Sequence, residues 1–153
     1  MSRAERAKEL FGQGYACSQA VVLAFADVAN VDEATLAKIT LPFGGGLGRL
    51  RLTCGAVSGM AAMAGLMLAE AENSPENKKK TYEIVRDLCE KFQAENGSLI
   101  CADLLSGANL QVVVGGEAEQ RTESYYKKRP CGDIVYSATK ILEEYLIEKG
   151  VIS

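Results

Sequence analysis

The segment from Gly55 to Ala69 constrains the fold most, because its 15 residues carry no charge and are rich in Gly, Ala and Met. A membrane span needs about 20 apolar residues, so a helix buried in the core of a globular protein explains the segment better. Gly55 and Gly59 stand one helical turn apart and would let a neighbouring helix approach closely. The segment therefore predicts a protein built by packing helices around a central apolar helix.

Apolar residues also recur at helical spacing through most of the remaining chain. Thr53 is expected to cap the central helix, which would start at Cys54 and end near Ala71. Only Leu110 to Val114 resembles a strand, and its only apparent partner is Leu50 to Thr53. We predict an all-α fold of about six to eight helices, a single compact domain over 1–153 with at most one short strand or hairpin near 110–114. The other helices should begin near Ser2, Ala16, Asp32, Pro75, Ser98 and Pro130.

Composition excludes several classes of function. The chain has no histidine, so a Ser-His-Asp triad, a Cys-His dyad and any histidine-ligated metal or haem are impossible. A net charge of −3 argues against nucleic acid as a partner. The N-terminal residues are charged and lack the apolar core of a signal peptide. We therefore expect a cytoplasmic protein without a membrane partner, whose thiols are reduced at rest.

Four of the five cysteines fall in the first turns of expected helices: Cys17, Cys54, Cys101 and Cys131. Each is also in phase with the apolar face of its helix. The first turn exposes backbone N–H groups and the positive end of the helix dipole, which favour an anion such as a thiolate. Because these thiols point inward, they are expected to converge on one interior site. Cys89 lies in mid-helix among apolar residues and is expected to be a small buried hydrophobe.

Basic residues precede two of these cysteines. Arg49 and Arg51 come shortly before Cys54, so we predict Cys54 to be the most acidic thiol and the attacking group. Arg49 follows a glycine-rich loop that leads toward a helix N-terminus, as anion sites do. Arg49 and Gly55 are therefore the candidate binding residues for a cofactor or a small anionic ligand. Lys127, Lys128 and Arg129 could lower the pKa of Cys131 in the same way, although a solvated run of charges is the simpler interpretation.

The sequence resembles a family of bacterial proteins described as redox-active and named for four cysteines, the C-GCAxxG-C-C family. The most specific match is the segment CGAVSG from Cys54 to Gly59, after a glycine-rich FGGG loop. Cys17 matches the leading cysteine of the family, and Cys101 and Cys131 match the last two. Cys89 matches no motif position. The resemblance implies a helical domain with a redox role, without an established substrate or reaction.

Three interpretations of the four cysteines stay open. The first is thiol–disulfide chemistry or electron transfer with an unknown redox partner, including an enzyme of the thiol-dependent oxidoreductase type; four cysteines allow three pairings. The second is an all-cysteine metal site, either an iron–sulfur cluster or zinc, with the same four residues as ligands. The third is a module that binds a small anion or a partner and uses the cysteines only structurally. A homodimer that covers the central helix stays open as well.

Overall fold

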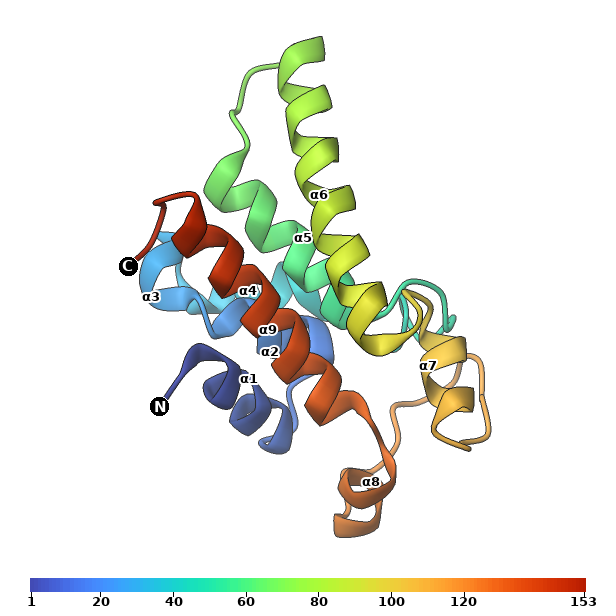
Figure 1. Ribbon diagram of the computed structural model, residues 1–153. Helices are drawn as coiled ribbons and strands as arrows, with labels where there is room; N and C mark the ends of the chain where they lie inside the picture. Colours follow the sequence, from blue (N-terminus) through green and yellow to red (C-terminus); the bar gives the residue numbers. More distant parts are fainter.

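The computed structural model describes all residues, 1–153, and consists of helices and loops (Figure 1). One 3₁₀ turn, η1 (Leu41–Phe43), precedes the glycine-rich loop, and one isolated bridge pairs Thr53 with Ile100. The all-α prediction is therefore confirmed. The α-helices are α1 (Arg3–Gly12), α2 (Cys17–Leu23), α3 (Ala26–Ala29), α4 (Glu33–Thr40), α5 (Gly55–Leu68), α6 (Pro75–Asn96), α7 (Cys101–Gly107), α8 (Glu123–Lys128) and α9 (Cys131–Glu148).

Helix α5 lies at the centre, as its lack of charge predicts. It packs against α2, α6 and α9, and its side chains Met60 and Met63 are fully buried. A cluster of 25 buried residues continues through α1, α2, α5, α6 and α9. Figure 1 shows the first half of α6 and the loop that leads into it projecting beyond the other helices. The core runs along α5 from Ala56 to Ala64, and the cysteine-bearing segments meet at the N-terminal end of this helix.

Two glycines of α5 allow α2 to lie directly against it. A Cβ atom at Gly59 would stand 2.7 Å from the carbonyl oxygen of Ser18, and one at Gly55 would stand 2.5 Å from Sγ of Cys17. Real Cβ atoms do not approach other atoms this closely, so both positions require glycine. The predicted close approach at Gly55 and Gly59 is confirmed, and the neighbour is α2.

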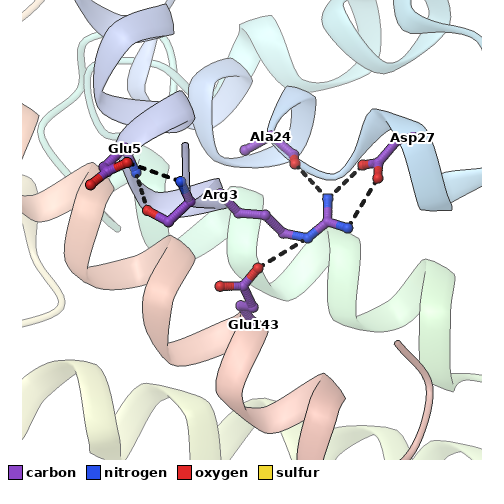
Figure 2. Close-up of polar contacts among 6 residues, drawn as sticks. Arg3, Glu5, Ala24, Asp27 and Glu143 are labelled. Carbon is purple, nitrogen blue, oxygen red and sulfur yellow. Dashed lines mark hydrogen bonds and ion pairs between the residues drawn. The ribbon is translucent and has the colours of Figure 1, made fainter. Parts of the chain in front are cut away.

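Arg3 holds α1 in place (Figure 2). Its guanidinium donates to both carboxylate oxygens of Asp27 and to the carbonyl oxygen of Ala24, and its Nε lies 3.1 Å from Glu143 of α9. Ser2 begins α1 with the predicted capping box, in which Ser2 and Glu5 each accept from the other's backbone N–H. These contacts connect α1, the α2–α3 segment and α9 into one layer.

Two predicted caps are wrong. Cys54 itself is the N-cap residue of α5, and α5 ends at Leu68 rather than near Ala71, because Thr53 is held in the bridge to Ile100. Ser98 is not the N-cap of α7; it accepts from the N–H of Ile100, which is the N-cap residue.

The predicted strand at 110–114 does not form. This segment does lie beside its expected neighbour: the N–H of Gly115 donates to the carbonyl of Arg49, and the Arg51 side chain donates to the carbonyl of Val113. One of these two bonds comes from the Arg51 side chain rather than from a backbone N–H. The backbone pairing therefore does not continue into a β-ladder. The count of six to eight helices is also low, because α2 and α3 divide the expected second helix and α8 was not expected.

No helix combines the length and the apolar character that a membrane crossing requires.

The Gly59 contact gives a stability test. Replacing Gly59 by Ala is expected to lower the free energy of unfolding by about 1–3 kcal/mol, because the new methyl group overpacks the α2–α5 contact. Gly65 lies on the same helix with open space around it. Gly65→Ala is therefore expected to raise stability by up to about 1 kcal/mol through helix propensity. Urea unfolding of both variants checks this, and equal effects of the two substitutions would contradict the close contact.

Candidate functional site

The four motif cysteines line one cavity of about 200 Å³, although they come from four separate segments. Cys17, Cys101 and Cys131 are the first residues of α2, α7 and α9, and Cys54 is the N-cap residue of α5. The sequence placed all four at helix starts, and the structure places them there. Cys89 is not among the lining residues; it lies on α6 and packs against the core. All five cysteines are free thiols in this structure.

The glycine-rich loop brings Cys54 and Cys101 to the same cavity. The N–H of Cys54 donates to the carbonyl of Leu99 at 2.8 Å, and the N–H of Cys101 donates to the carbonyl of Leu52 at 2.6 Å. These bonds tie the segment before α5 to the segment before α7. Gly46 has a φ of 73°, and a Cβ there would stand 2.7 Å from Cβ of Cys101. Glycine is needed at this point both for the turn and for the space.

Burial dominates the ionisation of three of these thiols. It raises the pKa of Cys17, raises that of Cys131 to about 12, and raises that of Cys54 well above the ordinary thiol value. The thiols also raise one another's pKa by mutual repulsion: Cys17 acts on Cys54 and Cys131, and Cys101 acts on Cys17. This mutual effect requires short separations, because electrostatic coupling falls with distance.

The prediction that Cys54 is the most acidic thiol is wrong. Cys54 is 6% exposed. The cost of removing its thiolate from water outweighs the stabilisation of that thiolate by the backbone N–H groups at the start of α5, so its pKa is raised. Neither Arg49 nor Arg51 donates a hydrogen bond to Cys54. Instead, Nη1 of Arg51 lies 3.7 Å from Sγ of Cys101 and donates to it. The thiol that receives a guanidinium is therefore Cys101.

Arg49 and Gly55, the predicted binding residues, both line the cavity. Nη1 of Arg49 donates to the carbonyl of Glu117, while its Nε is buried without a hydrogen-bond partner. Gly55 supplies no group of its own, and its role is to leave room for Sγ of Cys17.

Two further arginines line the cavity, and the sequence did not single out the first of them. Arg121 donates to the carbonyls of Phe11 and Tyr15, and its guanidinium lies 5.0 Å from the ring centre of Tyr125. Arg129 lies at the same distance from that ring and pairs with Glu119. Thr122, which caps α8, was the sequence signal that could have revealed this helix and its arginines.

The basic residues near Cys131 act on its pKa in the predicted direction, but the pKa is raised overall. Arg129 and Arg121 lower the pKa of Cys131, but burial and repulsion from Cys17 raise it by more. Lys127 and Lys128 are exposed and line no part of the cavity.

The arrangement does not form a compact site for a single metal ion. No three Cys, Asp or Glu side chains gather closely enough to hold one. A tetrahedral zinc site, which needs sulfur atoms at about 2.3 Å from the metal, is therefore not preformed. The four thiols do share one cavity.

The raised pKa of Cys131 predicts a loss of stability in alkali. A folded thiol that keeps its proton to about pH 12 stabilises the fold fully below its ordinary pKa of 9.0 and loses this effect as the pH rises above it. Cys131→Ser should therefore show a shallower fall of the free energy of unfolding between pH 9 and 12, by about 1.4 kcal/mol per pH unit. Chemical denaturation across this range measures it. Profiles that stay parallel above pH 9 would show that the folded thiol ionises normally.

Comparison with known proteins agrees with the cysteine pattern. No curated protein and no solved structure matches the chain significantly. The family described as "Putative redox-active protein (C_GCAxxG_C_C)" matches residues 15–145, which include all four motif cysteines and every residue that lines their cavity except Phe11. This match covers most of the chain, and the chain belongs to the C_GCAxxG_C_C family.

Proposed function

We propose that this protein exchanges electrons through thiol–disulfide chemistry at the four-cysteine cavity. The observation that carries the proposal is the convergence of Cys17, Cys54, Cys101 and Cys131 from four segments on one cavity. Buried cysteines that served only as small hydrophobes would have no reason to gather there and repel one another on ionisation. The family's description as redox-active supports the same class of function.

Cys101 is the proposed attacking thiol. Cys101, Cys17 and Cys131 are all partly exposed, but only Cys101 accepts from a guanidinium, that of Arg51 at 3.7 Å, and a cationic donor stabilises the negative charge on an attacking sulfur. Cys54, which the sequence favoured, is almost fully buried, and burial raises its pKa well above the ordinary thiol value. Cys54 is therefore poorly placed for the first attack.

Cys17 is the proposed resolving thiol. Among charged groups, Cys101 has the largest effect on the pKa of Cys17, which supports their being neighbours. The backbone of Gly45 lowers the pKa of Cys17, and the carbonyl of the same Gly45 accepts from the N–H of Arg51. The two thiols thus share one supporting loop.

The exchange proceeds in two balanced steps. The Cys101 thiolate bonds to one sulfur of a substrate disulfide, the S–S bond breaks, and the electron pair leaves with the first thiolate. Cys17 then loses its proton and attacks Sγ of Cys101, which releases the second thiolate. The protein has lost two electrons and two protons, and the two product thiols have gained them.

A second candidate is an all-cysteine metal centre, because four thiols on one cavity are also what an iron–sulfur cluster requires. Such a group would supply one-electron transfer. The four cysteines would hold it as thiolates, and their raised pKa values would fall on binding because metal binding releases the thiol protons. The absence of a preformed single-ion site makes zinc the weaker form of this candidate.

Single cysteine variants test the exchange. With a small disulfide as oxidant, Cys101→Ser is expected to slow oxidation at least about 100-fold, because no remaining thiol accepts from a guanidinium as Cys101 does from Arg51. Cys17→Ser should stop at a mixed disulfide on Cys101, seen as an added mass. Cys89→Ser is the matched control and should behave as the wild type, since Cys89 lies outside the cavity. A mixed disulfide found on Cys54 instead would overturn the assignment of Cys101.

Metal analysis separates the two candidates. Protein purified without oxygen and without added reductant is expected to be colourless and to contain no stoichiometric iron or zinc. A visible spectrum and elemental analysis measure this. Stoichiometric metal that is lost when any one of the four cysteines becomes serine would replace the exchange mechanism with a metal centre.

A further inference from the structure

The cavity that holds the thiols carries an excess of positive charge. Four arginines line it and one carboxylate does: Arg49, Arg51, Arg121 and Arg129 against Glu119. Glu119 is already paired with Arg129. The guanidinium groups of the other three arginines form no ion pair with any carboxylate of the protein. Charges removed from water are normally paired, so this excess requires a reason.

Arg51 is the clearest case. It is 7% exposed, and it forms no ion pair with any carboxylate. Its Nε donates to the carbonyl of Val113, and its Nη1 donates to Sγ of Cys101. A buried guanidinium held by one carbonyl and one thiol keeps donors free for another acceptor, because the group carries five N–H bonds.

Arg49 gives an independent second observation. Its Nε is the one buried side-chain nitrogen or oxygen atom in the molecule that has no hydrogen-bond partner. Leaving a buried donor unsatisfied costs free energy, and the cost disappears when a ligand supplies an acceptor. Arg49 and Arg51 also stand in the left-handed region, with φ of 64° and 61°, as does Leu47 of the same loop. Such backbone conformations are strained for residues other than glycine.

We infer that the substrate of the thiols is a small anionic disulfide, bound through its charged group by Arg51 and Arg49 with its S–S bond facing Cys101. The inference rests on the proposed thiol–disulfide exchange and adds the class of substrate. The guanidinium of Arg51 contacts Cys101, so an anion bound to Arg51 lies next to the attacking sulfur. A cavity of about 200 Å³ suits a molecule of small size rather than a protein segment.

The reaction balances without a further reagent. One disulfide bearing carboxylate groups and two cysteine thiols give one protein disulfide and two carboxylate-bearing thiols. The S–S bond of the substrate breaks and the Cys17–Cys101 bond forms. The two electrons and two protons lost by the cysteines appear in the two product thiols.

The test compares an anionic disulfide, dithiodiglycolate, with a neutral one, 2-hydroxyethyl disulfide. Rates of oxidation of the reduced full-length protein are normalised to those of dithiothreitol, which removes the intrinsic reactivity of each disulfide. The wild type is expected to prefer dithiodiglycolate about tenfold or more, since hydrogen bonds to charged groups carry an effect of this size. Arg51→Gln and Arg49→Gln should each remove most of this preference, read as the ratio of the two normalised rates, because any loss of Cys101 reactivity that both disulfides share cancels in that ratio. Arg86→Gln, an exposed arginine on α6 outside the cavity, should keep it.

A second measurement uses only the wild type, in case an arginine variant fails to fold. Glutarate, a dicarboxylate that cannot be reduced, should slow oxidation by dithiodiglycolate and leave oxidation by 2-hydroxyethyl disulfide unchanged. Equal normalised rates for the two disulfides, together with no effect of glutarate, would overturn the anionic substrate and leave the exchange proposal intact. Oxidation by neither disulfide would overturn both. A preference that survives in both arginine variants would move the anion to another part of the cavity and refute the assigned residues.

Discussion

The contact between α2 and α5 at Gly55 and Gly59 is the constraint on which the rest of the structure depends. Because neither glycine has a side chain, the backbone of Ser18 and the sulfur of Cys17 occupy the space that a Cβ would take. This contact sets the depth at which α2 sits against the central helix. It therefore also sets the position of Cys17 relative to Cys54, which lies one residue before Gly55. The same packing that stabilises the core builds one side of the cysteine cavity.

The opposite side of the cavity is built by backbone hydrogen bonds rather than by apolar packing. The segments that precede α5 and α7 are joined by bonds from Cys54 to Leu99 and from Cys101 to Leu52. The glycine-rich loop then turns tightly enough to place Arg51 between them. Burial keeps most of the thiols protonated, while the arginines stay charged. The cavity thus places four thiols beside arginines that have no carboxylate partner, an arrangement that would suit the proposed reduction of an anion.

Much of the fold could be predicted from the sequence because its determinants are local. The capping box at Ser2, the Asp32 cap, Pro75 and Gly97 each define a helix end through groups within a few residues of one another. The helix starts at Cys17 and Cys131 follow from apolar periodicity and from Pro130, which are also local. The caps at Thr53 and Ser98 could not be predicted, because long-range contacts near Ile100 determine what those residues bind. The prediction of a strand at 110–114 was wrong for the same reason, because long-range contacts with Arg49 and Arg51 determine what this segment binds.

The sequence by itself determined that four cysteines begin helices and face inward, since capping and helical periodicity are local properties. Only the tertiary structure decided what those thiols can do. Burial, which depends on the whole assembly of helices, raised the pKa of Cys54 against the local effect of the start of α5. The fold of the glycine loop turned Arg51 toward Cys101, although Cys54 is nearer in sequence. Arg121, more than a hundred residues from Phe11, reached the cavity only because α1 and the segment before α8 meet in space. Ionisation and charge pairing depend on distances between segments remote in the chain, and folding alone sets those distances.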